Sequence, residues 1–204
     1  MSENRRQLIE ELSKTPKKYP YKLISDEEIL ILYDSVVRLG AKVILDFGTG
    51  LGHGTMGLVF GAKETGGHVY SCDIGEGGDG ISKTVPKKFE GLGLSSLVTF
   101  TIEDDLEFLK KWGDKQIDFL YIDTSHTYKQ TKEEVGLAVP LLSENGECFI
   151  HDVLHATHYI DENAAILGFI QSQFINRTNL YGYEIIPVSF NAAGGLGRIY
   201  RYKI

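Results

Sequence analysis

Residues 43–54 read VILDFGTGLGHG, and this stretch decides the fold. A short apolar run ends in an acid, Asp46, and glycines follow at every second position from 48 to 54. Such a run predicts a buried strand of a parallel sheet over Val43 to Asp46. A glycine turn after the strand lets a ligand contact the backbone and lets the next helix begin close to the sheet. Because ligands of open α/β sheets bind at that end of the strands, we expect a nucleotide-like cofactor here.

Strands and helices alternate along the chain after this stretch. Further strands are predicted over residues 68–73, 97–102, 117–123 and 147–153, the last one after a turn at Asn145-Gly146. Helices are predicted over residues 53–62, 83–90, 106–112, 128–142 and 160–176. Two final strands, 183–190 and 198–204, are joined by a short glycine-rich loop and are expected to pair antiparallel. The alternation predicts an α/β fold, with a parallel sheet and helices on both faces.

The N-terminal part of the chain has helix signals on both sides of a break. Residues 3–14 have helix composition, and prolines 16 and 20 interrupt it. Ser25-Asp-Glu-Glu28 then matches a capping box and predicts a helix that ends at Gly40. We therefore expect residues 1–24 to form a helix with a linker or lid, and residues 25–204 to form a single domain.

Composition limits the class of protein. A length of 204 residues suits one domain, and 42% hydrophobic and 24% charged residues are typical of a soluble globular chain. The net charge of −7 and the absence of a basic run argue against nucleic acid and membrane surfaces as partners. Cys72 and Cys148 fall inside predicted strands and are expected to be buried thiols. The polar N-terminus predicts a cytoplasmic protein.

An acid falls at the C-terminal end of five successive predicted strands: Asp46, Asp73, Asp104, Asp123 and Asp152. In this architecture the carboxyl ends of the strands form the edge where ligands bind. Aspartate also starts turns and caps helices, so a single acid after a strand carries little information. Five acids that share an edge with one glycine turn favour a binding site.

Two of these acids suit an adenosine cofactor. An acid at the end of the second strand, Asp73, can accept hydrogen bonds from both ribose hydroxyls. Asp104, at the end of the third strand, is placed to accept one from an adenine amino group. A nicotinamide dinucleotide is disfavoured, because the only G-x-G-x-x-G near this turn begins at Gly52, six residues past Asp46.

Asp46-Phe-Gly48-Thr-Gly50-Leu-Gly52, with Asp73 and Asp104 after it, resembles the class I S-adenosylmethionine-dependent methyltransferases over about residues 22–204. The resemblance implies a Rossmann-like, doubly wound, seven-stranded sheet, mostly parallel, with one antiparallel strand near the C-terminus. It implies that Gly48 and Gly50 lie near the methionine part of the cofactor and that Asp46 helps to hold its amino end. The cofactor-binding residues it implies are Asp46, Gly48, Gly50, Gly52, Asp73, Ile74, Glu103, Asp104 and Asp123.

A narrower resemblance is carried by Asp123-Thr-Ser-His126-Thr-Tyr128 and His151-Asp152. These segments are similar to those of metal-dependent O-methyltransferases of the catechol type and the macrocin or cephalosporin-hydroxylase-like type, whose strand-end acids bind Mg²⁺. Carried over, Asp123, His151 and Asp152 are the metal ligands. Mg²⁺ keeps several waters and lowers the pKa of a substrate hydroxyl. His151 stands where those families mostly show an acid, and imidazole suits Zn, Fe or Ni better than Mg, so another divalent metal stays open.

His126 is the natural general base in this arrangement, and Asp123 is the second catalytic candidate. An imidazole is neutral near pH 7, and His126 follows Asp123 by three residues in the same loop. The function implied is methylation of an oxygen of a small hydroxylated acceptor, whose identity the sequence does not give. The sequence also leaves open whether the chain acts as a monomer or a homodimer.

Several alternatives stay open at the level of sequence. His126 could instead cap the following helix, and His151 could be a core histidine. The same fold could hold a redox metal for hydroxylation, because histidines and a carboxylate can form a facial iron triad. A non-catalytic domain that binds the cofactor is the remaining alternative.

Overall fold

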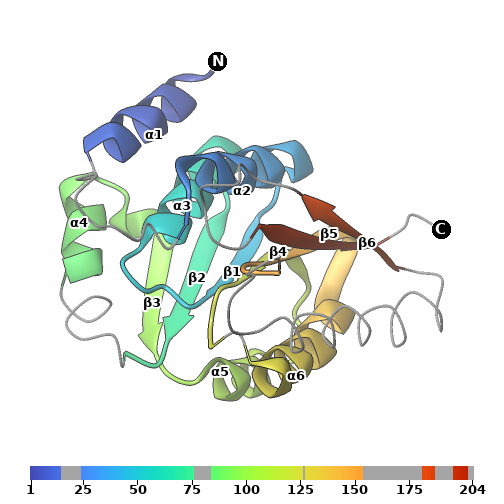
Figure 1. The fold of residues 1–204 in the computed structure, drawn as a ribbon. Helices are drawn as coiled ribbons and strands as arrows, with labels where there is room; N and C mark the ends of the chain where they lie inside the picture. The colour runs from blue at the N-terminus through green and yellow to red at the C-terminus, as the bar shows by residue number, and fades with distance from the viewer. Residues whose placement is uncertain (15–23, 76–83, 126, 154–180, 187–194, 202–204) are drawn as a thin grey trace.

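A computed structural model of the chain describes residues 1–14, 24–75, 84–125, 127–153, 181–186 and 195–201 (Figure 1). Within these residues one sheet of seven strands has the order β3-β2-β1-β4-β5-β7-β6. Its strands are β1 (Val43–Phe47), β2 (His68–Asp73), β3 (Val98–Ile102), β4 (Ile117–Ile122), β5 (Leu142–Ile150), β6 (Tyr181–Ile186) and β7 (Leu196–Arg201). The first five strands pair parallel, and β7 runs antiparallel to both β5 and β6. The predicted fold class, with its single antiparallel strand, is confirmed.

Helices cover both faces of the sheet in Figure 1. The described helices are α1 (Glu3–Lys14), α2 (Asp26–Leu39), α3 (His53–Thr65), α4 (Val85–Gly91), α5 (Asp105–Trp112) and α6 (Tyr128–Ala138). Side chains on the strands alternate between the two faces, so Ile44 packs with α2 and α3 while Leu45 packs with α5 and α6. Leu8 and Leu12 of α1 are buried in the first of these two cores. The predicted helix over 160–176 and the linker over 15–23 lie outside the described residues.

The glycine turn joins β1 to α3. Gly52 is the N-cap of α3 and has a left-handed conformation, with φ of 73°, which a residue with a side chain rarely adopts. The amide of Gly48 donates to the carbonyl of Cys72 at 2.9 Å, so the chain leaves β1 alongside β2. The turn therefore opens at the carboxyl edge of the sheet, as the sequence predicts.

The first turn of α2 is closed by the predicted capping box. The Glu28 amide donates to the Ser25 hydroxyl at 3.1 Å, and the Ser25 amide donates to Glu28 Oε2 at 2.7 Å. Gly40 ends the helix in a left-handed conformation. Glu28 lies in the first turn of α2 and is nevertheless fully buried. Its carboxylate lies inside the molecule, next to His151 at the end of β5.

Two predicted boundaries around β5 are wrong. The helix predicted to reach Leu142 ends at Ala138, and a 3₁₀ turn over Val139–Leu141 contains Pro140, which disfavours α-helix at the residue before it. Asn145-Gly146 is not a turn before the strand but lies inside β5. There the pairing with β4 shifts from Ile117↔Leu142 to Phe119↔Glu147, so the Asn-Gly pair occupies an irregularity of the ladder.

The cysteines and the helix lengths can also be compared with the sequence. Cys72 and Cys148 are free and buried, which confirms their assignment as core thiols. Among the described helices, none is long and apolar enough to cross a membrane.

Candidate active site

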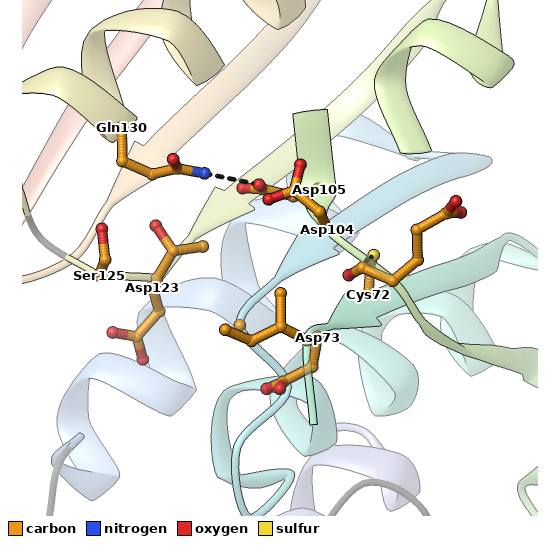
Figure 2. A pocket seen from close by; sticks show the side chains of 11 residues that line it. Cys72, Asp73, Asp104, Asp105, Asp123, Ser125 and Gln130 are labelled. Atoms are coloured by element: carbon orange, nitrogen blue, oxygen red, sulfur yellow. Dashed lines mark hydrogen bonds between the residues drawn. The ribbon is translucent and has the colours of Figure 1, made fainter. Parts of the chain in front are cut away.

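A cavity of about 410 Å³ lies at the carboxyl ends of β1 to β4 (Figure 2). Acids from three strand ends surround it, and the loop after β4 and the first turn of α6 close it. Its lining residues are Gly48, Cys72, Asp73, Ile74, Glu103, Asp104, Asp105, Asp123, Thr124, Ser125 and Gln130. Six of the predicted cofactor residues are therefore brought together around one cavity: Gly48, Asp73, Ile74, Glu103, Asp104 and Asp123.

Asp73 ties the glycine turn to the end of β2. Its Oδ2 accepts a hydrogen bond from the Gly50 amide at 2.8 Å, and its Oδ1 accepts one from the Gly75 amide at 2.7 Å. Each carboxylate oxygen can accept a further hydrogen bond, because each carries two lone pairs. The backbone thus fixes the carboxylate while leaving it able to accept donors from a ligand in the cavity.

Asp46 lies beneath this surface. It is fully buried, and its Oδ2 accepts hydrogen bonds from the hydroxyls of Thr55 at 2.7 Å and Ser71 at 2.6 Å. Burial raises the pKa of Asp46 to about 6, although the two hydroxyls oppose the shift by stabilising the carboxylate. Asp46 and Gly52 are not among the lining residues of the large cavity or of the second cavity described below. Any contact that Asp46 makes with a ligand has to pass through an intervening group or a local shift.

Asp104 caps a helix as well as lining the cavity. Its Oδ1 accepts from the amides of Leu106 at 3.0 Å and Glu107 at 3.1 Å, which satisfies the first turn of α5. Its neighbour Glu103 forms an ion pair with Lys111. Asp104 therefore has both roles expected of a strand-end aspartate: it caps a helix and it lines the cavity.

A buried polar network behind the cavity was not predicted. Gln130 donates from Nε2 to Asp105 Oδ1 at 2.7 Å, as Figure 2 shows, and the Thr124 hydroxyl donates to Glu134 Oε1 at 2.7 Å. Burial and a hydrogen bond with Asp105 raise the pKa of Glu134 to about 9. Glu134 therefore carries a proton at neutral pH, and the protonated acid links α6 to α5. Glu134 lies in the middle of α6, and nothing in the sequence pattern there predicts a buried, protonated acid.

A second cavity, of about 210 Å³, adjoins the first and shares Gly48, Asp73, Asp123 and Thr124 with it. Its other lining residues come from the glycine turn, the start of α3, the segment before α2 and the end of β5: Ile24, Thr49, Gly50, Leu51, His53, Gly54 and Asp152. Gly50, which the sequence assigned to cofactor binding, lies here. Gly48 and Asp123 thus border both cavities.

Asp123, His151 and Asp152 form a cluster beside the second cavity. One donor atom from each lies within 4.8 Å of the others, which confirms the proximity expected from the sequence. His151 Nδ1 lies 3.2 Å from Asp123 Oδ1 and 3.3 Å from Asp152 Oδ1. Asp152 has a φ of 60°, which is uncommon for a residue other than glycine. In this conformation its carboxylate lies close to the His151 ring.

The other nitrogen of His151 faces a residue that was not predicted. His151 Nε2 lies 3.4 Å from Glu28 Oε1, and both side chains are almost completely buried. Burial opposes a charge on the ring, but the hydrogen bonds with Asp123, Asp152 and Glu28 outweigh it and raise the pKa of His151 to about 12. Tyr121 adds a hydrogen bond from its hydroxyl to Asp123 Oδ2 at 3.2 Å. The capping box was the only signal that pointed to Glu28.

The predicted base, His126, lies outside the described residues, so its placement stays a prediction. Its neighbours are described. Ser125 lines the large cavity, and the Thr127 hydroxyl accepts the Gln130 amide at 3.3 Å as the N-cap of α6. The described residues on either side of position 126 therefore lie at the cavity and at the start of α6.

Residues 45–153, more than half of the chain, match the model of a family described as a methyltransferase domain. The chain belongs to this methyltransferase family. The matched region begins inside β1 and ends just after the Asp123, His151 and Asp152 cluster, so it contains the glycine turn and almost every lining residue of both cavities. The family expected from the sequence is thereby confirmed.

A curated relative agrees with the family assignment. The chain is 28% identical over 115 residues to the O-methyltransferase ankF of Aspergillus thermomutatus. That match covers 56% of this chain and 47% of the relative, so the chain spans about half the length of the curated relative it matches.

Solved structures share the fold. An O-methyltransferase from Bacillus cereus in complex with SAH superposes with a TM-score of 0.74 at 17% identity, covering 98% of this chain and 91% of that one. TomG, an O-methyltransferase from Streptomyces achromogenes in complex with SAM, gives a TM-score of 0.73 at 14% identity, covering 99% of this chain and 100% of that one. At these identities the likeness establishes the common fold.

Proposed function

We propose that this methyltransferase uses S-adenosylmethionine to methylate an oxygen of a small hydroxylated acceptor, with the assistance of a divalent metal. The observation that carries the proposal is the pair of adjoining cavities, one lined by the predicted cofactor residues and the other by the carboxylates of Asp123 and Asp152. Such an arrangement suits transfer between two bound molecules, because catalysis here depends on holding both in near-attack geometry. The O-methyltransferases among the relatives support the choice of oxygen.

The residues around the larger cavity fit S-adenosylmethionine. Asp73 is proposed to accept the ribose hydroxyls, since backbone amides hold its carboxylate at the cavity wall. Ile74, which is 53% exposed, offers an apolar surface to the adenine ring, and Asp104 and Glu103 line the same end. The bound cofactor supplies a methyl group on a sulfonium centre. Gly48 lines both cavities and Gly50 lines the second, and neither has a side chain that would exclude the cofactor's methionine part.

Two carboxylates, those of Asp123 and Asp46, lie near the proposed position of the cofactor's amino group. Asp123 lines both cavities and is proposed to face it directly, whereas Asp46 supports the turn from below. The buried carboxylate of Asp46 holds Thr55 and Ser71, and so fixes the glycine turn against β2. We therefore propose that Asp46 acts mainly by shaping the turn and by its charge.

The cluster of Asp123, His151 and Asp152 fits a divalent metal. Three donor atoms lie close enough to share one ion. The side chains of Asp123 and Asp152 line the second cavity, where the acceptor is proposed to bind. Such a metal would lower the pKa of an acceptor hydroxyl. The imidazole nitrogen among these donors suits metals such as Fe²⁺ or Zn²⁺ better than Mg²⁺. His126 is proposed as the base that removes the hydroxyl proton, and its loop begins at Ser125 on the cavity wall.

Isothermal calorimetry tests the cofactor. Chelator-treated protein is titrated with S-adenosylmethionine, with S-adenosylhomocysteine and, as a comparator, with NADH. Micromolar binding of the two sulfur compounds and no binding of NADH is the expected result. Binding of NADH alone would overturn the proposal in favour of a reductase, and binding of none would remove the cofactor assignment.

Turnover and metal content test the reaction. Small hydroxylated acceptors are screened with and without Mn²⁺, Zn²⁺ and Mg²⁺, and S-adenosylhomocysteine formation is measured. Replacement of His126 by alanine is expected to lower turnover and leave cofactor binding intact. Stoichiometric iron in the purified protein, together with hydroxylated product, would favour the hydroxylase alternative. Cofactor binding without turnover on any acceptor would favour a non-catalytic domain.

A further inference from the structure

Glu28 occupies an unusual position for a helix-capping residue. It lies at the third position of α2, is fully buried, and directs its two carboxylate oxygens to different elements. Oε2 accepts the amide of Ser25 at 2.7 Å, and Oε1 lies 3.4 Å from Nε2 of His151 at the end of β5. The capping box thus fixes one end of the carboxylate while the other end meets the ring.

The two nitrogens of the His151 ring face opposite sides. Nε2 faces Glu28, and Nδ1 faces Oδ1 of both Asp123 and Asp152. A neutral imidazole has a proton on one nitrogen and a lone pair on the other, and a hydrogen bond at one nitrogen decides which is which. Without a cation, carboxylates face both nitrogens and each nitrogen holds a proton. A cation held by Asp123 and Asp152 would take the Nδ1 lone pair in place of its proton, while the Glu28 carboxylate keeps the other proton on Nε2.

We propose that Glu28 is a positioning residue that sets the tautomer of His151, so that Nδ1 binds the metal and the site prefers a nitrogen-accepting divalent cation to Mg²⁺. The inference rests on the metal part of the proposed function. Carboxylates that accept the second N–H of a ligating histidine typically contribute 10- to 100-fold in metal affinity. Imidazole ligation favours ions such as Zn²⁺ and Fe²⁺ over Mg²⁺, which binds chiefly to oxygen.

Burial makes the arrangement specific. Glu28 and His151 are 0% and 1% exposed at their side chains, so no bulk water competes for the contact. The side chains of Asp123 and Asp152 are 20% and 19% exposed and line the second cavity, so an ion can reach the opposite nitrogen. The cation would enter from the cavity side, and Glu28 would act from the protein side.

Metal titrations of a Glu28 variant test the proposal. Glu28→Leu keeps the buried volume and removes both acceptor oxygens. Chelator-treated wild type and variant are titrated by calorimetry with Zn²⁺ and with Mg²⁺. The Zn²⁺ affinity is expected to fall at least tenfold and the Mg²⁺ affinity less than threefold. An equal fall for both ions would overturn the proposal, because loss of a nearby negative charge alone weakens all divalent cations alike.

Ser25→Ala is the matched control. It removes the serine half of the same capping box and leaves the Glu28 carboxylate beside His151. Its thermal midpoint is expected to fall, with both metal affinities within twofold of wild type. If Ser25→Ala weakens Zn²⁺ as much as Glu28→Leu does, Glu28 acts only through the helix end and the proposal fails.

The tautomer is read in the wild-type protein, so this test does not require the Glu28 variant to fold. Long-range ¹⁵N–¹H spectra of histidine-labelled protein with Zn²⁺, assigned by comparison with His151→Asn, should show the His151 proton on Nε2. A proton on Nδ1 would overturn the proposal. Failure to bind any metal would overturn it together with metal assistance, whereas binding of S-adenosylmethionine would still support the methyltransferase.

Discussion

Gly48 lies against the backbone of Asp123, so closely that a Cβ atom at position 48 would come within 2.6 Å of the Asp123 carbonyl carbon. Gly48 also has a φ of 89°, which residues with a side chain rarely adopt. The contact joins the glycine turn after β1 to the end of β4, and both residues line both cavities. A hydrogen atom as side chain is therefore required for the site to form.

Gly48→Ala is expected to destabilise the fold strongly. The new methyl group meets backbone rather than a flexible side chain, so strand ends have to move apart, and we expect a loss of roughly 3 kcal/mol or more in the free energy of unfolding. Gly50→Ala is the control, because Gly50 is also left-handed but has no neighbouring atom within 4 Å of its Cβ position. It should lose only about 1 kcal/mol. Urea unfolding curves measure both, and equal losses would contradict the steric argument.

Asp73→Ala is expected to weaken S-adenosylmethionine binding by at least tenfold. The change removes the proposed acceptor of the ribose hydroxyls and also releases the amides of Gly50 and Gly75 at the cavity wall. Calorimetry measures the affinity. Asp114→Ala, which removes the same charge at an exposed position, serves as the control and should bind as wild type does. Unchanged affinity of Asp73→Ala would remove the ribose assignment.

The strand-end acids were predictable because they depend on local pattern. The apolar run before Asp46 predicts a strand over 43–46, and β1 extends over Val43–Phe47. The parallel sheet brings the ends of successive strands to one edge, and Asp73, Asp104 and Asp123 accordingly line one cavity. Asp46 differs because its side chain faces α3 rather than the cavity, and the direction of a buried side chain at a strand end does not follow from the strand pattern.

Contacts that helices make with the sheet were not predictable in the same way. Glu28 was recognised as part of a capping box, but its contact with His151 depends on how α2 is rotated over β5. The pairing of Glu134 with Asp105 likewise depends on how α6 packs beside α5. Local signals fix where a helix begins, whereas the partners of its buried polar residues come from long-range packing.

Glu147→Gln should lower stability by about 2 kcal/mol. Glu147 on β5 is buried, and its carboxylate forms ion pairs with Arg38 of α2 and Arg198 of β7. Loss of the charge weakens both contacts, although Arg198 keeps its ion pair with Glu184. The cost stays below that of a fully buried pair because Arg38 is half exposed and can be hydrated. Thermal unfolding measures the change, and Glu144→Gln, at an exposed position of the same strand, should leave stability unchanged.

Glu134→Gln should change the pH dependence of stability. The pKa of Glu134 is raised to about 9 in the folded chain, against 4.5 as the ordinary value, so between these limits the folded state holds a proton that the unfolded state has lost. Wild-type stability from this group is complete below pH 4.5 and declines as pH rises towards 9, by at most about 1.4 kcal/mol per pH unit. An amide imitates the neutral acid at every pH. The difference in unfolding free energy, variant minus wild type, should therefore grow from pH 5.5 to pH 8.5 in urea titrations. Glu133→Gln, exposed at the adjacent position, should show no such trend, and a constant difference for Glu134→Gln would show that Glu134 is ionised at neutral pH.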